Sequence, residues 1–258
     1  MSAPGRKKKR FDFSKVVAPL IILVVIVAIC EVIARTTGIS EYILPAPSKI
    51  FLNTCSHFFV DIWEHFLITL KVILIGFVSA TVLGMLLAAL ISQSGLVTRA
   101  VSPLIIVLVI TPLITLIPLL TLWLGYDPMQ RAYVVIIQAT PIITLNTLNG
   151  FTNLDTEKLE LARAVGCTKL QRFVKITFMN AMPQVFTGIK LGCINSTIAA
   201  LSADMVSGNV GMGFKIKQFI HYNNIDLAYG SIIIVALIGL VTYNIVEYIE
   251  HKVVLWKN

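Results

Sequence analysis

Charged and hydroxyl side chains that interrupt long apolar runs are the residues most able to do chemistry in this sequence. Lys190 and Asp204 share one such run, where a charge is costly and normally faces a cavity or an oppositely charged partner. Cys193 and Thr197 lie between them at near-helical spacing, so the four residues follow one side of a predicted helix. This pattern suits the wall of a translocation path, and it also suits a contact between two membrane helices.

Each charge in this run also has a simpler interpretation. Lys190 can extend to a nearby membrane interface, and Asp204 can lie where its helix meets water. Weaker candidates for the same path are Thr111, Thr115, Gln138 and Thr144, of which the first two flank Pro112 in another apolar run. Because a proline removes a backbone hydrogen bond, we expect a bend there, either a hinge or a static kink.

Motifs for catalysis or metal binding are missing from the sequence. It contains no G-x-x-x-x-G-K-[ST] phosphate loop, no H-E-x-x-H and no G-x-S-x-G. Its four cysteines form no C-x-x-C pair, which gives no sign of a zinc site. We therefore expect no catalytic residue, metal or cofactor in this chain.

The composition indicates a membrane protein. Of 258 residues, 57% are hydrophobic and 13% are charged, whereas charged residues make up about a quarter of a soluble domain. The net charge of +8 would also suit nucleic-acid binding, but no basic patch with interleaved aromatic residues occurs. The basic cluster at residues 6–10 is better explained as a membrane topology signal.

Apolar runs predict six membrane-spanning helices, because a helix needs about 20 apolar residues to cross a bilayer. The runs cover residues 16–34, 63–91, 100–124, 131–151, 183–206 and 228–249. The expected fold class is therefore all-α and integral to the membrane. We expect a cytoplasmic basic tail at 1–15 and one six-helix domain at 16–258. Lys and Arg are concentrated in segments that face the cytoplasm if both termini lie there.

The longest predicted cytoplasmic loop, residues 153–181, has the punctuation of two short helices. Gly166 can end the first helix with a positive φ, and Thr168 with Gln171 matches a capping box that begins the second. An apolar stripe follows on this second helix and must pack on the chain itself or on a partner. Its residues are Leu170, Phe173, Val174, Thr177 and Phe178.

This loop resembles the EAA loop of ABC importer permeases, whose pattern is E-A-A-x-x-x-G-x9-I-x-L-P. The pattern is matched at Glu160, Ala162, Gly166 and Ile176. It is not matched at Leu161, where the family has Ala, or at 178–179, where Phe and Met replace Leu and Pro. The resemblance implies an ATPase-coupling site made of Glu160, Leu161, Ala162, Arg163, Gly166 and Ile176.

Further segments resemble the sulfonate, taurine and nitrate branch of these permeases. Residues 44–47 (LPAP) are similar to an L-P-S-P segment after the first span, and Thr111-Pro112 is similar to a proline-bearing third span. Residues 208–213 resemble an external G-L-G turn. The branch also places the fifth span, with Lys190 and Asp204, along the translocation path.

The resemblance implies a type I ABC importer permease and its partners. These are a second permease copy forming a homodimer, a dimer of ABC ATP-binding subunits that holds ATP and Mg, and an extracytoplasmic substrate-binding protein. The implied location is the bacterial cytoplasmic (inner) membrane. The implied cargo is a small polar nutrient such as a sulfonate, taurine, nitrate, or a vitamin or pyrimidine precursor. A secondary transporter without an ATPase is the main alternative, and a membrane-bound enzyme is the second.

Overall fold

The computed structural model describes residues 13–125, 128–154, 157, 160, 164 and 166–254, and every regular element among them is helical. The α-helices are α1 (Phe13–Thr36), α2 (Pro47–His57), α3 (Trp63–Ile91), α4 (Gly95–Ile110), α5 (Ile117–Leu124), α6 (Pro128–Thr152), α8 (Lys169–Arg172), α9 (Met179–Val206), α10 (Met212–His221) and α11 (Ile225–Val253). Short π-helical turns, Phe58–Ile62 and Phe173–Phe178, join α2 to α3 and α8 to α9.

Four of the described helical stretches are long and apolar enough to cross a membrane, and a bent pair can supply a fifth. The four are Pro47–Ile91, Met129–Thr152, Lys169–Val206 and Ile225–Val253. The predicted first span, 16–34, lies within α1, a helix of 24 residues, some of whose side chains are outside the described set. The all-helical membrane fold is confirmed, and the count of six spans stays a prediction.

The third predicted span, 100–124, is not one continuous helix. Gly95–Ile110 and Leu113–Leu124 are bent by 79° at the break between them. Pro112 follows the last turn of α4 and has no N–H to continue the helix, so the chain turns there. Pro118 lies in the first turn of α5, where its missing N–H costs nothing, and Pro141 lies inside α6.

Glycines let α3, α6 and α9 approach closely at the centre of the bundle. A Cβ on Gly84 of α3 would lie 2.8 Å from Ile143 Cγ2 of α6. A Cβ on Gly188 of α9 would lie 2.9 Å from the Asn146 Cβ of α6. Membrane helices use such small residues because lipid provides no hydrophobic force to drive their association. The three helices therefore form the core that carries the polar groups described below.

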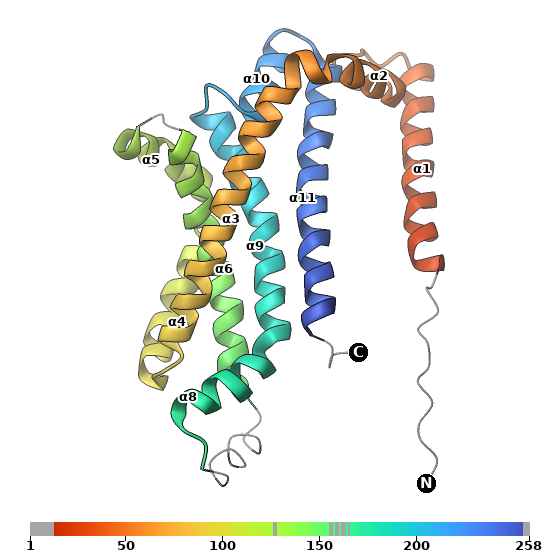
Figure 1. Cartoon of the computed structure of the whole chain (residues 1–258). Coiled ribbons are helices and arrows are strands. Elements are labelled where there is room, and N and C mark those ends of the chain that lie inside the picture. Colours follow the sequence, from red (N-terminus) through yellow and green to blue (C-terminus); the bar gives the residue numbers. More distant parts are fainter. Residues whose placement is uncertain are drawn as a thin grey trace, which may run out of the picture.

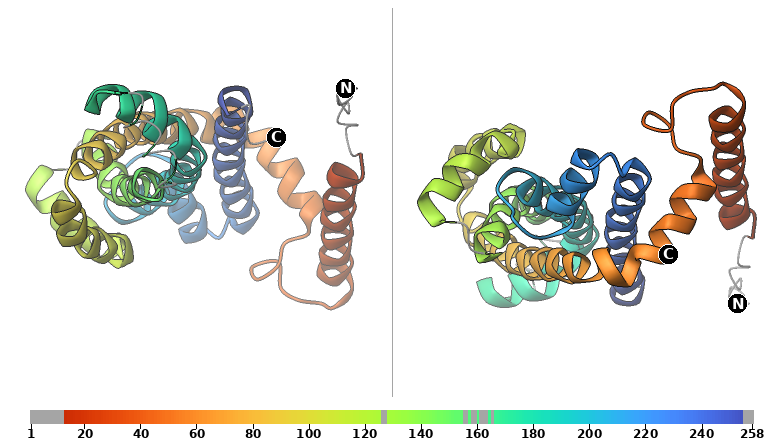
Figure 2. Two further views of the ribbon diagram at one scale, coloured as in Figure 1. Left: turned by 90° about the horizontal axis from the view of Figure 1, so that it is seen from below. Right: turned by 90° about the horizontal axis from the view of Figure 1, so that it is seen from above.

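Helix α1 stands apart from this bundle (Figures 1 and 2). Glu31 ties it to α2, accepting from the Ser48 amide (2.9 Å) and the Ser48 hydroxyl (2.7 Å). Its apolar side chains are largely exposed in the single chain. An apolar groove of about 760 Å³ separates it from α2 and α11.

The described ends of the chain lie at the same end of the molecule. Figure 1 shows that α1 begins and α11 ends toward the end where α8 lies, which we call the α8 end. Helices α2 and α10 lie at the opposite end, which we call the α10 end. This arrangement agrees with an even number of membrane crossings.

Candidate functional site

The predicted coupling loop has its expected local geometry at Gly166 and Thr168. Gly166 has φ +72°, a left-handed conformation that favours glycine. The Gln171 amide donates to the Thr168 hydroxyl (3.2 Å), and the Thr168 amide donates to the Gln171 side chain (3.1 Å). These two bonds form the capping box. The geometry is confirmed, and the coupling role stays a prediction.

Part of the predicted coupling motif lies outside the described residues. Leu161, Ala162 and Arg163 lie outside the described residues. Glu160 is helical and exposed, and Ile176 is half-buried. Glu160 is therefore available to a partner, whereas Ile176 contributes partly to the chain's own packing.

The apolar stripe on this loop divides into two sides. Phe173 and Phe178 pack on Phe151 of α6, with ring centroids 5.2 and 6.2 Å away. Leu170 is 72% exposed and Val174 is 52% exposed. The π-helical turn at 173–178 has more residues per turn than an α-helix and so rotates part of the stripe away from the bundle. One side of the stripe therefore packs on α6. The other side leaves two apolar side chains exposed and available to a partner.

The predicted loop boundary at 153–181 implies that the second helix of the loop ends before the fifth span. In the structure it does not end there. The chain is helical without interruption from Lys169 to Val206. Met179 stands where the family pattern has a proline, so no missing N–H breaks the helix there. Figure 1 shows α8 turned across the lower end of the bundle and continuing into α9.

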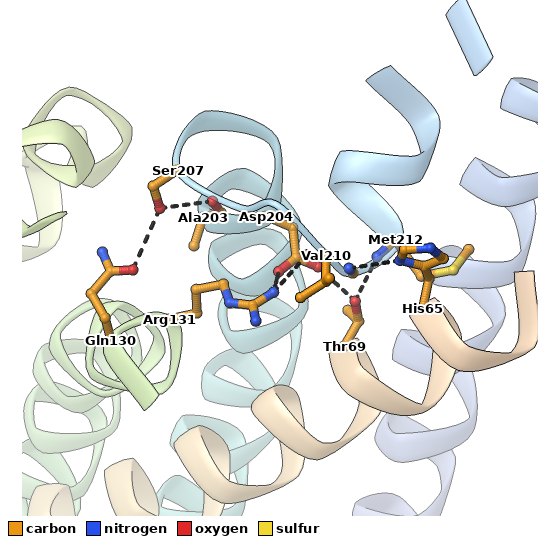
Figure 3. A network of polar contacts seen from close by, with 10 residues as sticks. His65, Thr69, Gln130, Arg131, Ala203, Asp204, Ser207, Val210 and Met212 are labelled. Carbon is orange, nitrogen blue, oxygen red and sulfur yellow. Dashed lines mark hydrogen bonds and ion pairs between the residues drawn. The ribbon is translucent and has the colours of Figure 1, made fainter. Parts of the chain in front are cut away.

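Asp204 lies in a buried polar network at the α10 end (Figure 3). Its carboxylate pairs with Arg131 of α6 at 2.7 Å and accepts from the Thr69 hydroxyl of α3 at 2.6 Å. Neither charged side chain is more than 3% exposed. The Arg131 guanidinium also donates to the Val210 carbonyl at 2.7 Å. The network joins α3, α6, α9 and the turn that leads into α10.

The turn at residues 207–211 is shaped around this carboxylate. The Met212 amide donates to Thr69 Oγ1 (2.8 Å), and the Gly211 amide donates to His65 Nδ1 (3.0 Å). Gly211 has φ +104°, and a Cβ there would collide with the Asp204 carboxylate. Glycine is therefore required by both conformation and space. The predicted G-L-G-like turn therefore packs directly against the Asp204 carboxylate.

A second ion pair holds α9 nearer the α8 end. Lys190 Nζ lies 2.7 Å from a Glu250 carboxylate oxygen of α11, and the two side chains are 18% and 6% exposed. The Tyr243 ring centroid is 5.9 Å from the same nitrogen. Lys190 thus has an oppositely charged partner within the chain.

The side of α9 predicted to line a path is the side that packs inside the chain. Cys193 is 1% exposed, Thr197 is 9% exposed and Asp204 is fully buried. A Cβ on Gly239 of α11 would lie 3.3 Å from the Thr197 side chain. The polar stripe is therefore a helix contact in this structure, because small and hydroxyl side chains permit close approach.

Thr111 and Thr115 lie beside the break in the third span. Their hydroxyls donate to the carbonyls of Val107 and Pro112, each at 2.8 Å. These bonds satisfy the hydroxyls locally and leave the two threonines at a bend, beside a small cavity. That cavity, of about 230 Å³, lies between α6, α9 and the segment that follows the break.

Comparison with known proteins identifies the family. The sequence model for the binding-protein-dependent transport system inner membrane component matches residues 80–255. The chain belongs to this family. It is a permease subunit of an ABC importer, as the EAA-like loop had indicated. The permease therefore works with an ATP-binding subunit and a substrate-binding protein.

Known relatives of the permease match it over nearly its whole length. The formylaminopyrimidine transport permease protein ThiX of Halalkalibacterium halodurans is 27% identical over 93% of this chain and 95% of its own. The putative aliphatic sulfonates transport permease protein SsuC of Bacillus subtilis is 26% identical over 99% and 91%. The nitrate import permease protein NrtB of Synechocystis is 26% identical over 97% and 95%.

Solved transporters share the fold of the permease. An amino acid ABC transporter crystallised with histidines has a TM-score of 0.60 and 16% identity, covering 79% of this chain and 97% of its own. The MetNI methionine ABC transporter in inward-facing conformations has a TM-score of 0.57 and 20% identity, covering 78% and 98%. These likenesses establish the predicted permease fold.

Sequence reasoning missed the partners of the two charges in the fifth span. Arg131, Glu250 and Thr69 were named in no predicted site. The available signal was the cost of a lone charge in a membrane, which requires a partner for Asp204 and for Lys190. The few ionisable residues at span ends were the natural candidates.

Proposed function

We propose that the permease forms, as a homodimer, the path by which a small polar nutrient crosses the bacterial cytoplasmic membrane. The α8 end faces the cytoplasm with both termini, and a dimer of ATP-binding subunits docks there. ATP and Mg belong to those subunits, and this chain carries no catalytic group. The substrate-binding protein delivers cargo at the α10 end. The cargo belongs to the range that spans sulfonates, taurine, nitrate, and vitamin or pyrimidine precursors.

The observation that carries this proposal is the form of the coupling loop. Gly166 and the capping box fix the start of α8, and Leu170 and Val174 then present apolar surface away from the bundle. Exposed Glu160 lies on the same loop. Apolar and acidic side chains projecting from one end of a membrane protein suit a soluble protein partner.

The test compares two glycines in predicted cytoplasmic loops. A Cβ added at either position meets no atom within 4 Å, but Gly166 alone of the two has a positive φ. Gly166→Val is expected to leave a chain that inserts in the membrane, recruits the ATP-binding subunit poorly and loses substrate-stimulated ATP hydrolysis. Glu160→Ala is expected to do the same less severely. Gly95→Val should retain recruitment and hydrolysis.

Pull-down of the ATP-binding subunit and ATPase activity in reconstituted vesicles are the two measurements. If Gly166→Val recruits and couples like the unmodified chain, the loop is only a connector. Uptake that continues without ATP would favour the alternative of a secondary transporter.

A further inference from the structure

The cavity between α6, α9 and the broken third span has a largely apolar wall. Leu113, Ile117 and Val134 are buried in its lining, and Ile198 is exposed at its edge. Pockets for drug-sized ligands occupy roughly 300–1,000 Å³, so a cavity of about 230 Å³ suits a smaller solute. Its walls come from helices that form the centre of the permease.

Two polar residues belong to this lining, Gln138 from α6 and Ser202 from α9. Within the part of the chain that the structure describes, neither side chain has a hydrogen-bond partner. Neighbouring residues behave differently: the Thr144 and Ser196 hydroxyls donate to the carbonyls four residues earlier. Gln138 and Ser202 are both half-buried, and their polar atoms are not among the fully buried ones that lack a partner, so they are accessible from the cavity and available to a ligand there.

The lining also limits the charge of that ligand. No charged side chain of the described residues lines the cavity. Lys71 of α3 is exposed and does not line the cavity, and Arg131 and Lys190 are paired with Asp204 and Glu250. Moving an anion into an apolar site without a cation costs far more than moving a neutral polar group. The cavity therefore disfavours sulfonate and nitrate.

The Gln138 amide offers N–H donors and a carbonyl acceptor in one plane. Such an amide pairs in a bidentate manner with a heterocycle edge that presents one acceptor and one donor. We propose that this cavity binds the cargo in transit, and that the cargo is a small uncharged nitrogen heterocycle of the pyrimidine kind. The ring lies against Leu113, Ile117 and Val134, and its polar edge meets Gln138 and Ser202. This inference rests on the proposed function and narrows its range of cargo.

The test uses the full permease with its co-purifying ATP-binding subunit in proteoliposomes, supplied with the substrate-binding protein. ATP-dependent uptake is measured for labelled formylaminopyrimidine, taurine and nitrate. We expect uptake of the pyrimidine and not of the two other probes. Gln138→Leu should lower pyrimidine transported per ATP by roughly tenfold, the effect of losing the hydrogen bonds of this amide to the cargo. Gln138→Glu, which keeps the shape but loses the donors, should lower it as well.

Asn195→Leu is the matched control. Asn195 also carries an amide in α9, but it donates to the Leu191 carbonyl at 2.9 Å and does not line the cavity. Its substitution should leave uptake unchanged. Absence of pyrimidine uptake by the unmodified transporter, or uptake of taurine or nitrate in its place, would overturn the inference. Pyrimidine uptake that both Gln138 variants retain would also overturn it. ATP hydrolysis that no loaded binding protein stimulates would count against the proposed function itself.

Discussion

Asp204 has no access to water, so its charge depends on the groups that surround it. Arg131 supplies the opposite charge, and Thr69 supplies a hydroxyl that also accepts from the Met212 amide. Removing one member of a buried ion pair leaves the other charge uncompensated, which is much costlier than losing both. This asymmetry predicts how variants of the pair behave.

Arg131→Met and Asp204→Leu should each destabilise the permease by about 3–5 kcal/mol, whereas the double variant should recover much of that loss. Each single variant should also lose uptake, because the turn before α10 loses its contacts with the ion pair. Thermal unfolding in detergent, with uptake measured in parallel, checks this. Arg35→Ala is the control, because its pair with Glu31 is exposed and screened by solvent, so its loss should change stability little. Additive losses in the double variant would show that the two residues act independently.

The sequence indicates that an unpaired Asp204 would carry a high free-energy cost in a membrane. It does not indicate that the partner of Asp204 is Arg131. Periodicity identifies one side of a helix and says nothing about which neighbour it meets. The side that holds Cys193 and Thr197 was therefore open to two interpretations until the positions of α3 and α11 were known. The cavity was harder still to predict, because Gln138 and Ser202 come from different helices and meet only in the folded chain.

At the scale of elements, two irregularities reshape what periodicity predicts. The break after Ile110 could be expected from Pro112, but its 79° angle could not, because a proline permits many bend angles. The π-helical turn at 173–178 has no comparable sequence signal, and it divides the apolar stripe of the coupling loop. The end of the loop's first helix and the start of its second, in contrast, could be predicted directly from Gly166 and Thr168.

The divided stripe predicts two distinct phenotypes. Replacing both exposed residues, Leu170→Ala with Val174→Ala, should weaken recruitment of the ATP-binding subunit and leave thermal stability nearly unchanged. Phe173→Ala should instead lower the unfolding temperature, because it removes a ring packed on Phe151. Pull-down and thermal unfolding separate the two effects. Recruitment that survives the double alanine variant would place the docking contact elsewhere.

At the scale of the whole molecule, the bias of basic residues predicts that the α8 end is cytoplasmic. Native Cys55, exposed in α2 at the α10 end, should react with an impermeant maleimide added outside intact cells. Native Cys167 should react only after the membrane is opened. Buried Cys193 is the internal control and should not react in the folded protein. Labelling of Cys167 from outside would reverse the orientation.

The length of α9 also has a mechanical consequence. Its 28 residues, Met179–Val206, extend about 42 Å, with α8 turned across the lower end and Asp204 near the upper end. A tilt of about 5° around the midpoint of α9 would displace its two ends by roughly 1.8 Å in opposite directions. Added to the 2.7 Å contact between Asp204 and Arg131, a displacement of that size would exceed hydrogen-bond range. A few degrees of rocking applied at the lower end would thus suffice to separate the ion pair at the other end.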